Sequence, residues 1–260
     1  MREAKAASYR QGLEAYREAV GPFADTVPEI RVETHFESLK DWSLFETQEG
    51  LEAWFQQQRD NCPMAVSEIG LAECSGWSRD DETGDYAHAS GEFFRVHGVR
   101  VRASASREVG GQGWDQPFLT QVGYDGGILG LLRQRHLGVP HYLVEAKAEP
   151  GNYEIIQMSP TLQATFSNLK RAHAGRRPRF AELFENPEAH DAIVHYKQWM
   201  SEDGGRLFNK RNLGMLVELP EGAEVEVPPG FHWVSLYQLK ACLLLNAWVN
   251  PHIRGIISHL

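Results

Sequence analysis

The sequence predicts an α+β fold, with a β-rich core, several helices and a helical N-terminal extension. Apolar residues near the N-terminus recur at helical spacing, whereas later segments alternate apolar and polar residues as half-buried strands do. The 260 residues are 42% hydrophobic and 23% charged, as in globular proteins. We find no internal repeat or low-complexity linker, so we expect an extension over residues 1–35 and one domain over residues 36–260.

Two amphipathic helices are predicted near the N-terminus. The first covers residues 1–20 and ends at Gly21-Pro22, where glycine and proline break helical geometry. The second covers Gln48–Arg59. Their apolar faces consist of Tyr9, Leu13, Tyr16 and Val20 in the first helix and of Leu51, Trp54 and Phe55 in the second. Such faces pack against a core or a partner chain.

The next part of the chain predicts antiparallel strands. Residues Ile69–Val122 alternate short apolar runs with turn residues, and Val99–Ser104 alternates strictly. A helix is predicted over Gly127–Arg135, which opens with glycines and carries Ile128, Leu129, Leu131 and Leu132. A strand is predicted over Tyr142–Glu149, followed by a turn at Pro150-Gly151-Asn152. The remaining predicted elements are an extended segment over 153–167, a helix over Phe180–Met200 broken at Pro187, a strand over Met215–Leu219 and a helix over Trp233–Val249.

Charge and composition argue against several classes of protein. The formal net charge is −9, whereas a nucleic-acid binder usually carries a positive stripe on a neutral or basic domain, so we expect no nucleic-acid partner. We expect no membrane partner either, because no apolar run approaches the ~20 residues of a spanning helix. The charged start lacks the apolar core of a secretory signal, and three cysteines without a CxxC pair favour a reducing cytoplasm.

The segment Ile156–Ser167 is the most informative. In an extended chain its odd positions share one face, which carries neutral hydrogen-bonding side chains: Gln157, Ser159, Thr161, Gln163, Thr165 and Ser167. A solvated face normally carries lysine and glutamate, whereas a ligand cleft needs oriented donors and acceptors. An ordinary exposed strand face is the alternative. Pro160 is compatible with a kinked strand that lines a pocket, but not with one uninterrupted central strand.

Charged residues flank this polar face. Glu145, Lys147 and Glu149 share a face at period two, which indicates either a surface ion pair worth ~0–1 kcal/mol or, in a cleft, acid–base groups with shifted pKa values. A basic cluster and a basic pair are either solvated surface or a diphosphate site, because arginine matches phosphate oxygens in bidentate geometry. The cluster consists of Lys170, Arg171, His173, Arg176, Arg177 and Arg179, and the pair is Lys210-Arg211.

Motifs that hold metals or cofactors are missing from the sequence. The chain has no GxxxxGK[ST] loop, no GxSxG elbow and no HExxH or HxH pair. The glycine-rich stretch Gly123–Gly130 lacks GxGxxG spacing. The sequence thus lacks the common signatures of a phosphate-binding loop, a nucleophile elbow, a paired-histidine metal site and a dinucleotide loop.

Several long segments occur in an order that is hard to obtain by chance. The longest is Lys147–Asn152 followed by Gln157–Asn168. The supporting segments, in chain order, are His88–Phe94, Trp114–Gln121, Gly127–Gly130, Ser201–Gly204, Lys210–Asn212 and Val249-Asn250. Together, from about Phe36 to the C-terminus, they resemble the NDP-hexose 2,3-dehydratase family of deoxysugar biosynthesis.

The resemblance implies a fold and a reaction. The fold is a Nudix-like α+β domain, with a mixed or antiparallel sheet and flanking helices. The substrate is a nucleotide-linked, typically dTDP-linked, 4-keto-6-deoxyhexose that loses its C2 hydroxyl as water, without a metal or redox cofactor. Typical members carry the repeat twice, and this sequence carries one copy, so we expect a homodimer that imitates the tandem arrangement.

The resemblance also implies candidate site residues. For catalysis these are Glu149 as base and Lys147 as enolate stabiliser or acid, with His88 or Glu202 as alternative bases. Arg171, Lys210 and Arg211 are the candidates for the diphosphate, and Phe94 or Trp114 for stacking on the nucleobase. The other candidate substrate contacts are Gln116, Gln121, Asn152, Gln157, Ser159, Thr161, Gln163, Thr165, Ser167, Asn168 and Asn212.

Three other functions remain open at the level of sequence. The first is a different dehydratase or an isomerase that acts on another nucleotide sugar. The second is a module that binds a nucleotide sugar without converting it. The third, a nucleic-acid binder that uses the basic cluster, fits the charge of −9 least well.

Overall fold

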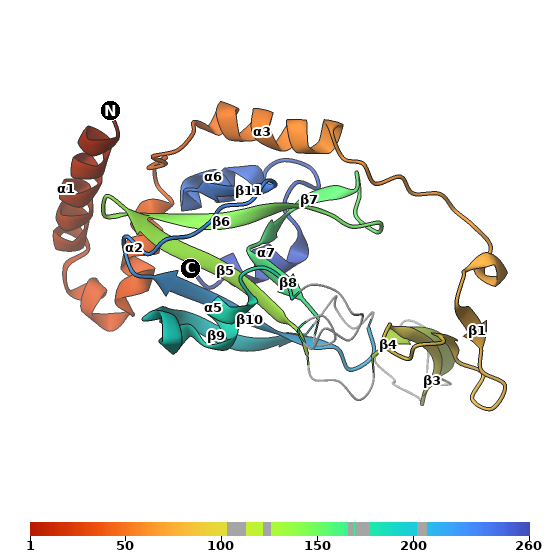
Figure 1. Cartoon of the computed structure of the whole chain (residues 1–260). Helices are drawn as coiled ribbons and strands as arrows, with labels where there is room; N and C mark the ends of the chain where they lie inside the picture. Colours follow the sequence, from red (N-terminus) through yellow and green to blue (C-terminus); the bar gives the residue numbers. More distant parts are fainter. Residues whose placement is uncertain (103–112, 122–125, 166–168, 170–176, 202–206) are drawn as a thin grey trace.

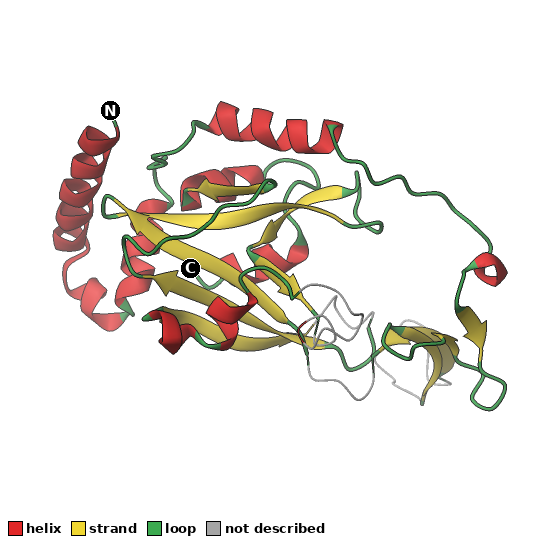
Figure 2. Ribbon diagram, viewed as in Figure 1, coloured by secondary structure: helices red, strands yellow, loops and turns green. Residues whose placement is uncertain are grey.

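The computed structural model contains two β-sheets, with helices packed around the larger one (Figure 1). It describes residues 1–102, 113–121, 126–165, 169, 177–201 and 207–260. Figure 2 shows helices on both sides of the larger sheet, while the smaller sheet lies beyond one end of it. This arrangement confirms the predicted α+β class. None of the helices in the described ranges is both long and apolar enough to cross a membrane.

The larger sheet has seven strands, ordered β11-β6-β5-β10-β9, with β7 paired to β6 and β8 paired to β5. Only β5 and β10 run parallel, and the other neighbours are antiparallel. The strands are β5 (Ile128–His136), β6 (Val139–Ala148), β7 (Ile156–Pro160), β8 (Leu162–Ala164), β9 (Ile193–Ser201), β10 (Arg211–Leu219) and β11 (Phe231–Val234). The strands predicted over 142–149 and 215–219 are thereby confirmed, and each is longer than predicted.

The sequence-based prediction of a helix over residues 127–135 is wrong, because this segment is the central strand β5. Leu129 and Leu131 face a cluster formed with α3 (Gln48–Asp60), α6 (Leu236–Cys242) and α7 (Pro251–Ile257). Ile128 and Leu132 face a cluster formed with α5 (Ala181–Glu185) on the other side. A strand covered on both faces has no polar alternation, so its pattern resembles that of a buried helix.

The N-terminal helices pack on the closed end of the β5–β6 hairpin. Helix α1 (Arg2–Val20) confirms the first predicted helix, and α3 confirms the second. A 3-10 turn, η1 (Gly21–Thr26), leads into α2 (Glu29–Glu37), which the sequence analysis did not predict. Residues of α1, α2, the segment between α2 and α3, and the hairpin share one buried cluster, which consists of Ala6, Tyr9, Leu13, Phe36, Trp42, Leu44 and Val139. The boundary predicted at residue 35 stays a prediction.

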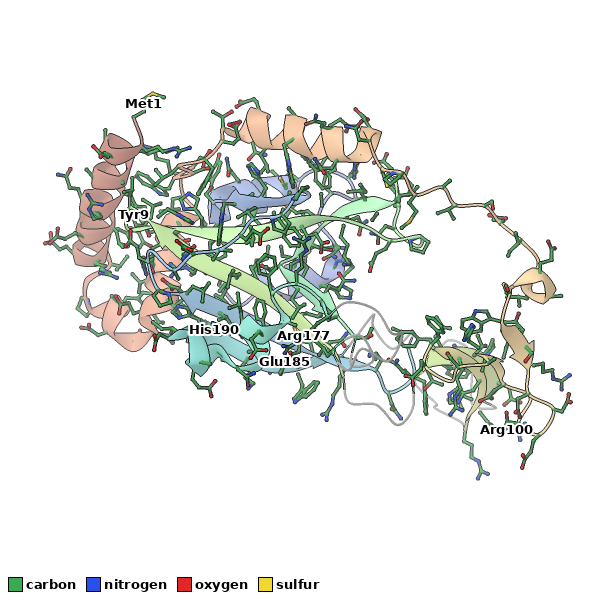
Figure 3. The ribbon with its side chains drawn as sticks, in the orientation of Figure 1. Met1, Tyr9, Arg100, Arg177, Glu185 and His190 are labelled. Atoms are coloured by element: carbon green, nitrogen blue, oxygen red, sulfur yellow. The ribbon has the colours of Figure 1, made fainter. Side chains whose placement is uncertain are left out.

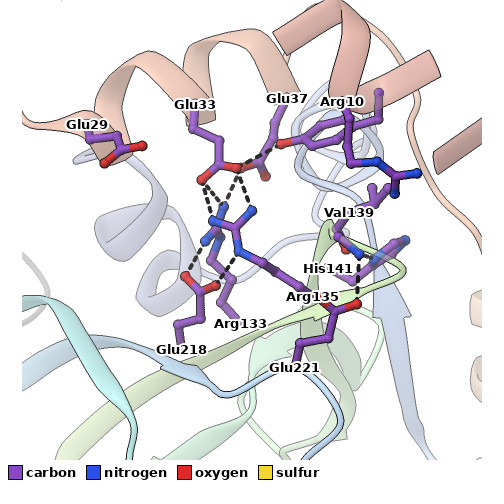
Figure 4. A network of polar contacts seen from close by, with 12 residues as sticks. Arg10, Glu29, Glu33, Glu37, Arg133, Arg135, Val139, His141, Glu218 and Glu221 are labelled. Atoms are coloured by element: carbon purple, nitrogen blue, oxygen red, sulfur yellow. Dashed lines mark hydrogen bonds and ion pairs between the residues drawn. The ribbon is translucent and has the colours of Figure 1, made fainter. Parts of the chain in front are cut away.

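A buried charge network joins α2 to the larger sheet (Figure 4). The fully buried Arg133 of β5 donates to Glu33 and Glu37, at 2.7 Å each, and to Glu218 of β10. Arg135 donates to the same Glu33 at 2.7 Å and to Glu218 at 2.9 Å. Since each charge has close partners, the network ties helix and sheet together.

The smaller sheet is the predicted antiparallel meander in the described part of residues 69–122. A short 3-10 turn, η2 (Leu71–Glu73), precedes it. Its strands follow chain order: β1 (Trp77–Arg79), β2 (Tyr86–His88), β3 (Arg95–Val101) and β4 (Trp114–Thr120). The chain that leads into β10 meets its edge, where Phe208 N donates to Leu119 O at 2.9 Å.

Two further predicted helices are each only partly helical. The segment 180–200 forms α5 and the 3-10 turn η3 (Pro187–His190), but then becomes β9, which pairs with β10. The segment 233–249 begins as β11, and α6 starts only after Ser235. The Ser235 hydroxyl accepts from Gln238 N, and the Gln238 side chain accepts from Ser235 N, each at 3.1 Å. This capping box was a readable signal for the start of α6.

Candidate functional site

The candidate site lies where β5 and β6 diverge. The two strands pair along the hairpin as far as Leu132 and Leu143, and beyond that point β8 pairs with β5 while β7 pairs with β6. Thr161, between β7 and β8, closes this fork. Its hydroxyl donates to Leu143 O and accepts from Leu132 N, so the predicted kink after Pro160 has a structural cause.

The predicted charged face and the predicted neutral face lie on neighbouring strands. On β6 and β7, Glu145 is directly opposite Ser159, and Lys147 is directly opposite Gln157. Side chains opposite each other in a sheet share a face. The Lys147 Nζ atom lies 3.4 Å from Glu145 Oε2, and both side chains are 24% exposed. This pair is therefore half-buried and loosely held.

A chain of hydrogen bonds fixes the orientation of the Gln163 amide. Its Nε2 donates to Glu149 Oε1 at 2.9 Å. Its Oε1 accepts from Ser159 Oγ at 3.2 Å and from Asn250 Nδ2 at 3.1 Å. Asn250 Nδ2 also donates to Ser159 Oγ at 2.5 Å, while Asn250 Oδ1 accepts from Ile253 N and caps α7. Glu149 is thus connected through side chains to the start of a helix.

Glu145, Lys147 and Gln163 border a cavity of about 450 Å³, which we call the Lys147 cavity. A volume of this size is typical of small-molecule sites. Its wall combines charged and neutral polar groups of β6 and β8 with prolines, an arginine and an aromatic ring from other segments. The lining residues are Glu145, Lys147, Thr161, Leu162, Gln163, Pro178, Arg179, Pro228, Pro229 and Phe231. The two predicted faces therefore meet at one cavity.

Burial shifts the pKa of one carboxyl group in this wall. It raises the pKa of Glu145, and the positive charge of Lys147 only partly opposes this rise. A carboxyl group with a raised pKa holds a proton closer to neutral pH and can donate it to a leaving group. The site thus offers an ammonium group, a carboxyl group with a raised pKa and a second carboxylate positioned by an amide.

Another group of predicted residues lies where the smaller sheet meets the start of β10. Lys210 Nζ lies 5.4 Å from the centre of the Phe94 ring and 3.5 Å from Gln121 Oε1. Gln121 Nε2 donates to Glu92 O at 3.3 Å. On β4, Trp114 Nε1 donates to Gln116 Oε1 at 2.7 Å. None of these described residues lines the Lys147 cavity.

The remaining predicted residues are dispersed. His88 ends β2 in the smaller sheet, with its Nδ1 atom 2.8 Å from Ser90 Oγ. Arg211 lies 4.6 Å from the centre of the Trp199 ring, and Asn212 Oδ1 accepts from Gly127 N at 2.8 Å. In the turn after β6, Asn152 Nδ2 donates to Ile155 O at 3.1 Å. Thr165 is half-buried directly after β8. Glu202, Ser167, Asn168, Arg171 and the other basic residues Lys170, His173 and Arg176 lie outside the described residues.

Sequence reasoning did not assign three residues that the structure places at the site. Asn250 belongs to a segment that carries the family resemblance, but nothing in its local pattern connects it to Gln163. The contact depends on Met158 N donating to Trp248 O and Asn250 N donating to Met158 O. Arg179 was counted only within the basic cluster. Phe231 reaches the cavity because it pairs with Glu145 across β11 and β6.

Comparison with known proteins identifies the family. The model of the NDP-hexose 2,3-dehydratase family matches residues 48–260. A dTDP-4-dehydro-6-deoxy-alpha-D-glucopyranose 2,3-dehydratase from Streptomyces violaceoruber is 36% identical over 211 residues, covering 81% of this chain and 46% of that protein. The enzyme of the same name from Amycolatopsis orientalis is 34% identical over 214 residues, covering 82% of this chain and 44% of that protein.

The chain thus spans about half the length of these curated relatives. Among solved structures, the Ap4A hydrolase of C. elegans gives a TM-score of 0.28 at 12% identity, covering 50% of this chain and 91% of that chain, a similarity too weak to support an argument. The family match covers most of the chain and includes every strand around the Lys147 cavity. The chain therefore belongs to the NDP-hexose 2,3-dehydratase family.

Proposed function

We propose that this chain carries a nucleotide-sugar 2,3-dehydratase site, which removes the C2 hydroxyl of a dTDP-4-keto-6-deoxyhexose. The observation that carries the proposal is the shared wall of the Lys147 cavity, where Glu145, Lys147 and Gln163 meet and Gln163 holds Glu149. The family membership and the names of the curated relatives support the choice of substrate.

The chemistry follows from the C4 ketone, which acidifies the hydrogen on C3. A base removes that proton, and the electron pair moves into an enolate. The C2 hydroxyl is β to the ketone, so the enolate expels it, and protonation releases it as water. The resulting enol tautomerises to a 3,4-diketo-2,6-dideoxy sugar. Elimination and tautomerisation are together redox-neutral, so these steps consume no oxidant or reductant.

Three side chains divide this work in our proposal. Glu149 takes the C3 proton, and the hydrogen bond from Gln163 holds its carboxylate in place. Lys147 donates to the enolate oxygen, since a cation in a half-buried site stabilises developing negative charge. Glu145 gives its proton to the leaving hydroxyl, because burial raises its pKa. His88 and Glu202 stay the alternative bases.

Product analysis by NMR tests the function. The purified chain is incubated with dTDP-4-keto-6-deoxyglucose, and we expect the methine signal of C2 to be replaced by the signal of a C2 methylene. A different product from another nucleotide sugar would favour another dehydratase or an isomerase. Binding of the sugar nucleotide without any product, measured by calorimetry, would instead identify a module that only binds.

The predicted homodimer and the predicted cytoplasmic location belong to the same proposal. The dimer would bring two copies of the fold together, as the tandem repeat of typical family members does. Light scattering of the purified chain tests the dimer, since a mass of twice 29.4 kDa is expected and a mass of 29.4 kDa would contradict it.

A further inference from the structure

A second cavity adjoins the Lys147 cavity on the side of α5 and η3. It has a volume of about 570 Å³ and we call it the α5 cavity. Figure 3 marks this side of the molecule with the labelled side chains of Arg177, Glu185 and His190. Its lining residues are Arg179, Phe180, Leu183, His190, Asp191, Leu219, Ala223, Glu224, Val225, Glu226 and Pro228. Arg179 and Pro228 line both cavities.

An aromatic pair separates the two cavities. Phe231 lines the Lys147 cavity and Phe180 lines the α5 cavity. Their rings meet edge to face, with centres 5.3 Å apart. Phe180 also holds a left-handed backbone conformation, with φ of 62°, which residues other than glycine rarely adopt. The two cavities are therefore neighbours that meet at this ring contact and at the Arg179 and Pro228 that line both.

Arg179 differs from the neighbouring Arg177 in its partners. Arg177 contacts Glu182 and Glu185, at 2.5 Å each, so two carboxylates already neutralise it. Arg179 is exposed and takes part in no salt bridge with another described residue. A guanidinium group without a carboxylate partner, at the edge of a cavity, is suited to bind phosphate oxygens in bidentate geometry.

The charges inside the α5 cavity indicate which part of a ligand enters it. Asp191, Glu224 and Glu226 repel phosphate, but their oxygens accept hydrogen bonds from sugar hydroxyls and from the N–H groups of a base. Phe180, Leu183 and Val225 add an apolar surface for a ring. The nucleoside part of a nucleotide sugar offers both such hydrogen-bond donors and a ring, and the diphosphate attached to it suits the guanidinium group of Arg179.

We propose that the substrate lies across both cavities, with the hexose in the Lys147 cavity, the diphosphate at Arg179 and the nucleoside in the α5 cavity. This inference rests on the proposed function, since it divides the same nucleotide sugar between two cavities. It places the diphosphate away from Lys210, which contacts Phe94 and Gln121, and from Arg211, which lies over Trp199.

Calorimetric titration with dTDP tests the inference. Arg179→Gln is expected to weaken dTDP binding by about 10–100-fold, because hydrogen bonds to charged groups are lost. Arg177→Gln, a matched change in the same segment, is expected to leave binding within about twofold of the wild-type affinity. Val225→Trp fills the α5 cavity without changing charge, and is expected to weaken dTDP binding by at least about 10-fold. Thermal unfolding confirms that each variant is folded.

The outcomes separate this inference from the function. If Arg179→Gln and Val225→Trp bind dTDP like the wild type, or if only Lys210→Gln and Arg211→Gln lose binding, the two-cavity arrangement is overturned, even where NMR shows product. If dTDP binding depends on Arg179 and Val225 while the wild type forms no product, the arrangement stands and the dehydratase proposal falls.

Discussion

The larger sheet carries two clusters in which cations meet carboxylates, and the two clusters differ in how completely their charges are paired. At the closed end of the β5–β6 hairpin, Arg133 is fully buried and contacts the three carboxylates of Glu33, Glu37 and Glu218. At the open fork, Lys147 is 24% exposed and lies 3.4 Å from Glu145. In the first cluster the guanidinium group of Arg133 is used up by contacts within the protein. The second borders a cavity and keeps donors and acceptors that a ligand can use.

This difference in pairing indicates that the Arg133 cluster stabilises the fold and that the Lys147 pair is the one available for catalysis. Buried charges are tolerated only when hydrogen bonds and opposite charges satisfy them, so removing one partner destabilises the whole network. A loosely held pair contributes little to stability, but its groups can exchange protons with a substrate. The variants below separate these roles by measuring turnover and unfolding on the same protein.

The largest effect is expected for the proposed base. Glu149→Gln keeps the size of the side chain but removes the group that takes the C3 proton, so kcat should fall by about 10²–10⁴-fold. NMR assays of dTDP-4-keto-6-deoxyglucose measure this fall. Glu145→Gln is the matched change on the cavity wall. If Glu149→Gln retains full kcat while Glu145→Gln does not, Glu149 is not the base, and the carboxyl group that the reaction needs is that of Glu145.

A large loss of stability is expected at the other cluster. Arg133→Met leaves Glu33, Glu37 and Glu218 buried with fewer partners, and should lower the free energy of unfolding by about 3–5 kcal/mol. Urea denaturation followed by fluorescence measures it. A loss below about 1 kcal/mol would show that the network does not hold α2 against the sheet.

Lys147→Ala should lower kcat and leave stability nearly unchanged, whereas Arg133→Met mainly lowers stability. Loss of the donor to the enolate oxygen is expected to lower kcat by about 10²–10³-fold. The free energy of unfolding should change by less than about 1 kcal/mol, because the pair with Glu145 is loose and partly exposed. An unfolding loss as large as that of Arg133→Met would assign Lys147 a structural role instead.

The pH dependence of stability separates two carboxyl groups within the buried network. Burial raises the pKa of Glu37 from 4.5 to about 6, although the charge of Arg133 opposes it. Burial also acts on Glu33, but the hydrogen bonds and charges of Arg135 and Arg133 outweigh it and lower the pKa of Glu33 to about 2. The two groups therefore respond to pH in opposite directions.

The stability from Glu37 is fully present below about pH 4.5 and is lost as the pH rises through 6, an effect of about 2 kcal/mol. The stability from Glu33 is present above pH 4.5 and is lost as the pH falls towards 2. Urea denaturation of the wild type, Glu37→Gln and Glu33→Gln at several pH values tests both signs. Parallel pH profiles for the two variants would contradict the assignment.

The smallest effect is expected for Asn250→Asp. The new carboxylate still accepts from Ile253 N and caps α7, but it cannot donate to Ser159 Oγ and Gln163 Oε1. The Gln163 amide then loses its fixed orientation towards Glu149, so kcat should fall by about 10-fold. Unchanged kcat would show that Asn250 serves only the helix.

The sequence predicted the local parts of the site well. Alternation over residues 142–149 and 156–164 placed Lys147 and Gln163 on strand faces, and Pro160 predicted the kink, because these patterns depend on neighbouring residues. Local patterns gave wrong predictions where contacts with distant parts of the chain determine the secondary structure or the burial of a residue. Residues 127–135 look helical because the strand is covered on both sides, and the buried Glu33 resembles a solvated residue until Arg133 is placed beside it.

Solvent-deuterium exchange at C3 of dTDP-4-keto-6-deoxyglucose tests the central claim most directly, because it reports the first proton transfer whether or not product follows. In D₂O, the wild type should exchange the C3 proton or release the C2 hydroxyl, and Lys147→Ala should do both at least about 10²-fold more slowly. Tight binding of the sugar nucleotide with no exchange, or equal exchange by the two proteins, would contradict a catalytic Lys147 cavity.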